Sequence, residues 1–233
     1  MIIKVCGMRN ADNIREVSEL DIDMMGFIFW EKSSRYVRMI SSKVGTLPDY
    51  SAERYDNLSG GKTVVAAENK PKRVGVFVDD MPQNIVTRIY NYNLDYVQLH
   101  GNESVVMIDN LVKTVDPDIH KDIKIIKALS INTPEDIDKY KEYEGHVDMF
   151  LFDTKCDTVG GSGQHFDWSV LERYDGNTPF LLSGGIGPED VEKVKSFHHP
   201  KCVGIDINSR FETEPAMKDV ELLRSFVSQV KGV

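Results

Sequence analysis

The strongest constraint on the fold is a repeated alternation of short apolar runs and helix-like segments along the whole chain. Eight runs have the length and the β-branched or apolar composition of buried strands, and they begin at Ile2, Met24, Arg73, Leu94, Ile123, Val147, Pro179 and Cys202. Amphipathic or capped helix patterns lie between several of them, over residues 10–20, 82–90, 133–143, 188–194 and 215–230. Strands that alternate with helices predict a parallel sheet.

Eight β/α units in 233 residues are the number and size expected of a (β/α)8 TIM barrel, for which about 250 residues are typical. We therefore predict an α/β chain that forms a single barrel domain over residues 1–233, with an open doubly wound sheet as the alternative. The longest interval between neighbouring runs holds a polar, turn-rich stretch at about 48–72. This stretch is predicted to be an extended surface loop, either a tolerated insertion or a lid.

Composition narrows the function classes. The chain has 28 basic and 37 acidic residues, a net charge of −9, which disfavours a nucleic-acid binder because such proteins usually present a basic face. The three cysteines, Cys6, Cys156 and Cys202, are isolated, which argues against a disulfide framework or a zinc ribbon. The sequence shows no signal-peptide pattern and no apolar run long enough to cross a membrane. We expect a cytoplasmic protein that binds neither nucleic acid nor membrane.

Polar side chains at the ends of the predicted strands mark a candidate site. In a parallel barrel the reacting groups lie at the C-terminal ends of the strands, and alternate residues point inward. Polar or ionisable residues near the ends of five of the runs are Lys4, Cys6, Gln98, His100, Lys127, Asp153, Asp206 and Asn208. Closure of the barrel is expected to bring these ends together.

Two of these residues are candidates for acid–base chemistry. An isolated cysteine is most often a small buried apolar side chain, but a Cys6 thiolate at a strand end would be a base or nucleophile if Lys4 lowered its pKa. Asp153 is either a helix cap or partner of Lys155, or a proton donor whose surroundings keep it partly protonated.

Glycine-rich turns indicate an anion site. Ser183-Gly184-Gly185-Ile186-Gly187-Pro188 follows the seventh run, and phosphate sites of such barrels often lie after strands seven and eight, where backbone N–H groups approach the ligand. A second cluster, at 160–163, is either a flexible connection or a loop that closes over a ligand. Arg35, in a polar loop after the second run, is either solvated or holds a carboxylate with two hydrogen bonds. The histidines show no metal-ligand spacing.

Taken together, these residues resemble the phosphoribosylanthranilate isomerase family, (β/α)8 enzymes of tryptophan biosynthesis. The resemblance covers almost the whole chain, and the order and spacing of its motifs make it specific. The motifs are Lys4-Val5-Cys6-Gly7, Gly26-Phe27-Ile28-Phe29, Ser33-Ser34-Arg35-Tyr36-Val37, Val74-Gly75-Val76-Phe77-Val78, Val97-Gln98-Leu99-His100-Gly101, Phe152-Asp153-Thr154, Gly161-Ser162-Gly163, Phe180-Leu181-Leu182-Ser183-Gly184-Gly185-Ile186 and Gly204-Ile205-Asp206.

The resemblance implies an isomerase that converts N-(5'-phosphoribosyl)anthranilate into 1-(2-carboxyphenylamino)-1-deoxyribulose 5-phosphate by an Amadori rearrangement, without cofactor or metal. It implies that Asp153 is the general acid that protonates the furanose ring oxygen. Cys6 is then the general base that removes the proton from C2′. One group must be protonated while the other is ionised, so their surroundings must move the two pKa values in different directions.

The resemblance also implies how the substrate is held. Arg35 matches the position that binds the anthranilate carboxylate, and Gly184 and Gly185 match the phosphate-binding turn. The remaining residues that it implies at the substrate are His100, Asp206 and Ser209.

The chain departs from the family after Asp206, where Arg210 stands in place of a glycine, and the stretch after Pro48 is longer than the family pattern. The alternatives are another phosphosugar barrel, similar to indole-glycerol-phosphate synthase or to an epimerase, and a non-catalytic protein that binds a phosphorylated ligand. The synthase would need a lysine acid with glutamates at strand ends, and the epimerase would need metal-binding histidines. In each case we expect a small phosphorylated molecule as partner and a chain that is a monomer or a homodimer.

Overall fold

The structure is a computed structural model that describes residues 1–38, 71–154 and 168–232. Eight parallel strands close into a barrel in chain order, because β8 pairs with β1. The strands are β1 (Ile2–Val5), β2 (Met24–Ile28), β3 (Lys72–Phe77), β4 (Tyr96–Leu99), β5 (Lys124–Ser130), β6 (Met149–Asp153), β7 (Phe180–Ser183) and β8 (Cys202–Ile207). The predicted barrel is confirmed, and the open doubly wound sheet is wrong.

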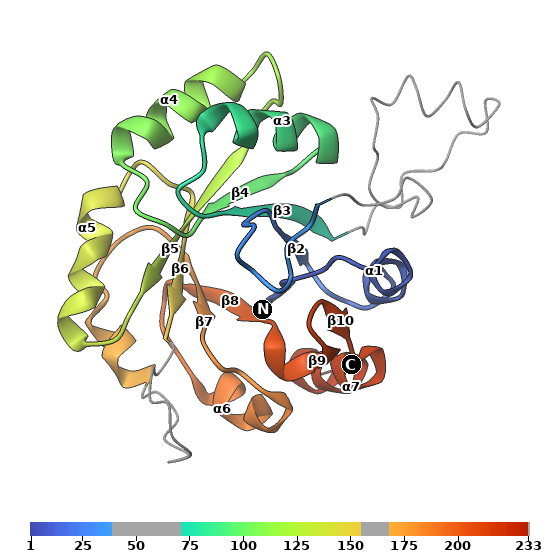
Figure 1. Cartoon of the computed structure of the whole chain (residues 1–233). Helices are drawn as coiled ribbons and strands as arrows, with labels where there is room; N and C mark the ends of the chain where they lie inside the picture. The colour runs from blue at the N-terminus through green and yellow to red at the C-terminus, as the bar shows by residue number, and fades with distance from the viewer. Residues whose placement is uncertain (39–70, 155–167, 233) are drawn as a thin grey trace.

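Helices surround the barrel, as Figure 1 shows. They are α1 (Ala11–Ser18), α3 (Pro82–Tyr92), α4 (Val105–Val115), α5 (Tyr140–Tyr143), α6 (Val191–Ser196) and α7 (Val220–Lys231). Short 3₁₀ helices add to them: η2 (Pro134–Lys139), η3 (Trp168–Arg173), η4 (Pro188–Asp190) and η5 (Ser209–Phe211). Among the described residues, no helix is long and apolar enough to span a membrane.

The period of two along each strand separates the core into two layers. The barrel interior is filled by a small cluster of inward residues, which are Met24, Val74, Ile126, Ala128, Met149, Leu151 and Leu181. A larger cluster of the alternate residues packs between the strands and the helices. Inward positions near the C-terminal ends of β1, β4, β6 and β8 are polar but buried, and they are Lys4, Gln98, Asp153 and Asp206.

Two segments differ from the sequence-based expectation. The helix predicted from 215 to 230 begins only at Val220, where Asp219 caps it by accepting a hydrogen bond from the Leu222 N–H. The residues before it form a short antiparallel hairpin of β9 (Glu212–Glu214) and β10 (Met217–Lys218), which turns through Ala216 at φ +69°. Pro215 therefore belongs to a turn and not to a helix start.

The loop predicted at about 48–72 lies outside the described residues up to position 70, and Lys72 already opens β3.

Candidate active site

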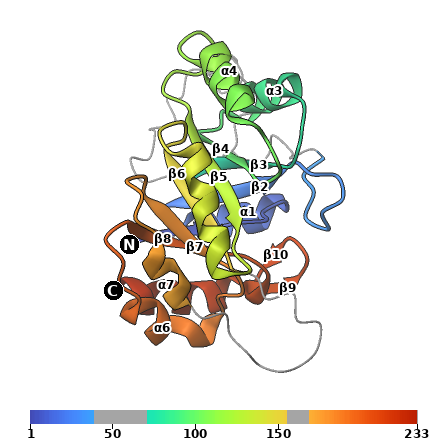
Figure 2. The ribbon, with the colours of Figure 1, turned by 90° about the vertical axis from the view of Figure 1, so that its left-hand side faces the viewer.

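The C-terminal mouth of the barrel gathers residues from six of its strands and the loops that follow them. Cys6 follows β1, His100 follows β4, and Asp153 ends β6. Gly184 and Gly185 follow β7, Asp206 lies near the end of β8, Ser209 opens η5, and Arg35 lies in the loop after β2. In Figure 2 the N-terminus, from which β1 starts, lies on the left, and the β9–β10 hairpin lies on the right. The hairpin is therefore on the side of the barrel away from the start of β1, which is the side of the mouth. The predicted clustering of strand ends is therefore found.

Cys6 occupies a tight space made for its sulfur. Its N–H donates to the Ile207 carbonyl of β8 at 2.9 Å, and its side chain is 4% exposed. Gly26 of β2 faces the thiol, because a Cβ at that position would lie 2.7 Å from the Cys6 Sγ. Gly7 takes the left-handed conformation at φ +81°, and a Cβ there would lie 2.6 Å from the Cδ of the Arg35 side chain. The two glycines allow both side chains to lie at the mouth.

Burial raises the pKa of the Cys6 thiol above its ordinary value, and Asp206 adds to the rise, while Lys4 and Lys218 oppose it. The expectation that Lys4 lowers the pKa is thus half right. Lys4 does favour the thiolate, through its charge and a hydrogen bond, but the loss of hydration is the larger effect. A thiolate formed at this position is therefore a stronger base than an ordinary cysteine thiolate.

Lys4 lies directly below Cys6 on the inner face of β1. It is 0% exposed, and its Nζ donates to the Asp206 Oδ1 of β8 at 2.8 Å. Burial works against its charge, but Asp206 and the Cys6 thiolate together raise the pKa of Lys4 above its ordinary value. The Ser183 hydroxyl, at the end of β7, lies 3.4 Å from the other Asp206 oxygen. Asp206 is thus reached from both neighbouring strands.

Asp153 ends β6 on the inner face and is buried. The His100 Nε2 lies 3.7 Å from its Oδ2, and the His100 Nδ1 lies 3.4 Å from the Gln98 Nε2. Gln98 and His100 share the inner face of β4, as the alternation along that run predicts. The structure therefore places a histidine beside the candidate acid, while Lys155 lies outside the described residues.

The turn after β7, which the sequence suggested as an anion site, contains two glycines with positive φ. Gly184 has φ +110°, and a Cβ on it would lie 2.6 Å from the Thr154 Oγ1, so only glycine fits. Gly185 has φ +69°, and a Cβ on it would meet nothing within 4 Å, so open space lies beside the turn. Ser209 is exposed, and the neighbouring Arg210 forms an ion pair with Glu189. The Arg210 side chain thus joins the loops that follow β7 and β8.

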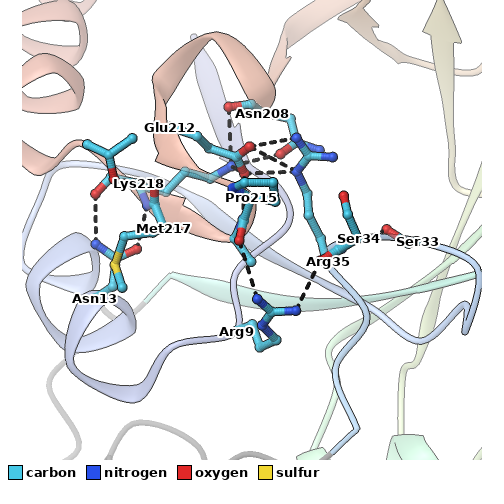
Figure 3. A network of polar contacts seen from close by, with 12 residues as sticks. Arg9, Asn13, Ser33, Ser34, Arg35, Asn208, Glu212, Pro215, Met217 and Lys218 are labelled. Carbon is cyan, nitrogen blue, oxygen red and sulfur yellow. Dashed lines mark hydrogen bonds and ion pairs between the residues drawn. The ribbon is translucent and has the colours of Figure 1, made fainter.

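Arg35 forms an ion pair with Glu212 of β9, in which its Nη2 lies 2.6 Å from the Glu212 Oε2 (Figure 3). Arg9 spans the same loops, since it donates to the Ser34 carbonyl at 3.0 Å and to the Pro215 carbonyl at 3.3 Å. Lys218 of β10 donates to Glu212 at 2.7 Å. Glu212 and Lys218 were not predicted from the sequence, because the polar segment around them was interpreted as the start of a helix.

Lys127, which was grouped with the strand-end residues, does not reach the mouth. Inward residues of β5 are Ile126 and Ala128, so Lys127 points outward, toward the helix layer. Its Nζ donates to the Gly101 carbonyl at 2.7 Å and to the Glu103 carboxylate at 3.0 Å. The pair fixes the loop after β4 from outside the barrel, so the expected placement of Lys127 is wrong.

Two further expectations concern loops and metals. The glycine cluster at 160–163 lies outside the described residues, as does Cys156. Within the part of the chain that the structure describes, no group of three His, Cys, Asp or Glu side chains is arranged to hold a metal ion.

Comparisons with known proteins identify the family and the fold. Residues 3–229 match the family model of N-(5'phosphoribosyl)anthranilate (PRA) isomerase. An N-(5'-phosphoribosyl)anthranilate isomerase of Parabacteroides distasonis is 46% identical over 99% of this chain and 93% of its own. A solved phosphoribosyl anthranilate isomerase in complex with reduced 1-(o-carboxyphenylamino)-1-deoxyribulose 5-phosphate superimposes with a TM-score of 0.73 at 28% identity, over the whole of both chains. The monomeric form of a dimeric isomerase from Thermotoga maritima gives a TM-score of 0.72 at 26% identity, again over both full chains.

Proposed function

The chain belongs to the N-(5'-phosphoribosyl)anthranilate isomerase family of tryptophan biosynthesis, and on this premise we propose that Cys6 and Asp153 carry its reaction as general base and general acid. The observation that carries the proposal is that both side chains are buried at the same mouth of the barrel, at the ends of β1 and β6. Each lies beside an ionisable partner, Lys4 for Cys6 and His100 for Asp153.

The proton transfers follow from these positions. Asp153 donates its proton to the furanose ring oxygen as the bond from that oxygen to C1′ breaks, which leaves a Schiff base. Cys6, as a thiolate, removes the proton from C2′, and the electron pair of that bond forms an enolamine that tautomerises to the ketone. Lys4 and Lys218 stabilise the thiolate by their charge, which offsets part of the cost of its burial.

We propose that the two anionic ends of the substrate lie on either side of this pair. The phosphate is bound by backbone N–H groups of Gly184 and Gly185, with Ser209 beside them, because the turn is open at Gly185. The carboxylate is bound by Arg35, and His100 and Asp206 contact the ribose part. A crystal structure with reduced product analogue tests this arrangement, and phosphate density away from the Gly184–Gly185 turn would contradict it.

The catalytic roles are tested with Cys6→Ser and Asp153→Asn. Each variant should lower kcat by about a hundredfold or more, with much smaller changes in analogue Kd, because the lost groups transfer protons in the transition state and do not bind the ligand. The assay follows the fluorescence of phosphoribosylanthranilate as it is consumed. Cys202→Ser and Asp148→Asn are the matched controls, and both should keep wild-type kcat. A near-normal kcat for Cys6→Ser or Asp153→Asn would refute the role of that residue.

The remaining properties are also proposals. The closed barrel over the described ranges supports a single domain over 1–233. We propose that the polar stretch after Pro48 is a surface loop that ends before β3 begins at Lys72. The biosynthetic role supports a cytoplasmic location and no nucleic-acid or membrane partner. The Thermotoga maritima relative has been solved as monomers of a dimeric protein, which supports a monomer or a homodimer for this chain, and light scattering of the purified protein decides between them.

A further inference from the structure

We infer that Glu212 is a positioning residue that fixes the Arg35 guanidinium for the substrate carboxylate. The inference rests on the carboxylate-binding role proposed for Arg35 and extends it to a residue of the β9–β10 hairpin. Glu212 and Arg35 are far apart in the sequence, and the hairpin brings them together at the mouth (Figure 3).

The geometry leaves part of the arginine available. The Arg35 Nε lies 2.9 and 3.0 Å from the two Glu212 oxygens, and its Nη2 lies 2.6 Å from Oε2. Glu212 therefore takes the side edge of the guanidinium, which Nε and Nη2 form. A guanidinium has five N–H donors in a rigid plane, so the end edge, formed by both Nη atoms, can still bind a second carboxylate with two hydrogen bonds. Glu212 therefore orients the Arg35 guanidinium without occupying the edge at which the substrate carboxylate would bind.

Glu212 is itself held in place. Its side chain is 4% exposed, and its Oε1 accepts hydrogen bonds from the Lys218 Nζ at 2.7 Å and from the Ala216 N–H at 3.2 Å. Lys218 donates also to the Asn208 Oδ1 at 2.7 Å, and its backbone N–H and carbonyl both bond to the Asn13 side chain of α1. The carboxylate is thus anchored to the body of the barrel, while Arg35 is the more exposed partner at 21%.

The charges also favour a second carboxylate. Burial opposes ionisation of Glu212, but its bonds to Arg35 and Lys218 bring its pKa below the ordinary value, so it is an anion at neutral pH. The hydrogen bonds that Arg35 donates to Glu212 raise the pKa of Arg35. One carboxylate between two cations leaves this group of three with one positive charge in excess, which favours the approach of an anion to Arg35.

The test compares two ligands on Glu212→Gln. One is the reduced product analogue, and the other is the same molecule with an unsubstituted anilino ring, which lacks the carboxylate. A glutamine keeps the shape but sets an NH₂ donor against the donors of Arg35 and Lys218, so Arg35 loses its fixed orientation. We expect Kd for the carboxylated analogue and KM for substrate to rise about tenfold or more, whereas Kd for the anilino analogue stays within about twofold.

The controls separate this inference from the role of Arg35. Glu221→Gln, in the exposed pair with Arg224 on α7, should leave both affinities unchanged. Arg35→Gln should lose affinity for the carboxylated analogue alone. If Arg35→Gln binds both analogues as the wild type does, the proposed role of Arg35 is wrong and the inference is overturned with it. If Arg35→Gln shows the selective loss and Glu212→Gln does not, or if Glu212→Gln weakens both analogues equally, only the inference about Glu212 is overturned.

A failure of Glu212→Gln to fold does not end the test. Glu212→Asp keeps the charge on a side chain one methylene shorter, which cannot reach Arg35 and Lys218 together. This variant should show the same selective loss for the carboxylated analogue, about threefold or more, and equal affinities of the variant and the wild type would overturn the inference.

Discussion

Replacing Lys4 by methionine should destabilise the protein and, separately, suppress ionisation of Cys6. Lys4 is fully buried and lies 2.8 Å from the Asp206 Oδ1, so the substitution leaves the Asp206 carboxylate buried with only the Ser183 hydroxyl, at 3.4 Å, among the described contacts. Methionine fills a similar volume, which limits the cavity contribution. The main cost is the uncompensated carboxylate.

The magnitude follows from that orphaned charge. Removing one partner of a buried ion pair typically costs about 3–5 kcal/mol of the free energy of unfolding. For a chain of this size each kcal/mol shifts Tm by about 2–4 °C, so a fall of roughly 10 °C is expected. The double variant Lys4→Met with Asp206→Leu should recover most of the loss, because replacing both charges by apolar groups is often close to neutral.

Lys124→Met is the matched control. Lys124 makes an ion pair of almost the same length with Asp148, at 3.0 Å, but both side chains are more than a third exposed. Exposed pairs contribute about 0–1 kcal/mol, so this variant should unfold close to the wild type in a urea titration. Equal losses for Lys4→Met and Lys124→Met would refute the assignment of the stabilisation to a buried, mutually dependent pair.

The second readout is the pKa of Cys6, taken from thiolate absorbance as the difference between each protein and its Cys6→Ser counterpart. Burial raises this pKa above the ordinary 9.0, so the thiolate signal in the wild type should appear above that pH. Lys4 favours the thiolate, so its loss should move the titration to still higher pH. The Cys6 pKa can only rise in this variant, because removing a nearby cation disfavours the thiolate anion. An unchanged or lower pKa in Lys4→Met would show that Lys4 does not support the base.

Three further substitutions test the turn after β7 and the outward pair on β5. Gly184→Ala should cost about 2 kcal/mol or more in stability, since its Cβ would overlap Thr154 as well as requiring φ +110°. At Gly185 an added Cβ has space, so Gly185→Ala should lower the free energy of unfolding by only about 1–2 kcal/mol. It should also weaken the binding of inorganic phosphate, measured by calorimetry. A larger loss of stability for Gly185→Ala than for Gly184→Ala would contradict the packing. Lys127→Met should lower the free energy of unfolding in urea by about 3 kcal/mol, because the buried Glu103 carboxylate keeps its backbone N–H donors but loses the cation that pairs with it. The analogue Kd per folded molecule should be unchanged, and weaker analogue binding would contradict the outward placement.

The barrel and the placement of Cys6 and Asp153 at its mouth could be predicted, because each depends on local patterns. Apolar runs of strand length alternate with helix patterns, which fixes the fold class, and alternation along a strand places Cys6 on the same face as Lys4. Motif order then identifies the family. The same reasoning failed for Lys127, because a strand-end position alone does not say which face a residue occupies. Its inward neighbours Ile126 and Ala128 carry that information, since they fill the barrel interior.

The hairpin at 212–218 could not be predicted, and the reason is physical. Pro215 is common at a helix start, and the apolar pattern from Val220 onward is helical, so the local signals favour one longer helix. The turn is instead fixed by distant contacts. Asn13 bonds both backbone groups of Lys218, and Arg9 donates to the Pro215 carbonyl. Neither contact leaves a trace in the sequence around the hairpin.

Those distant contacts explain how an acidic chain can support an anion at Cys6. Three cations and two carboxylates meet around the thiol, and they are Lys4, Lys218, Arg35, Asp206 and Glu212. The two carboxylates hold the cations in fixed positions but leave one positive charge in excess. Ionisation of Cys6 brings this cluster to neutrality. A net charge of −9 over the chain is therefore compatible with an anion at Cys6, because the buried charges that interact with the thiol act on it far more strongly than screened charges on the surface.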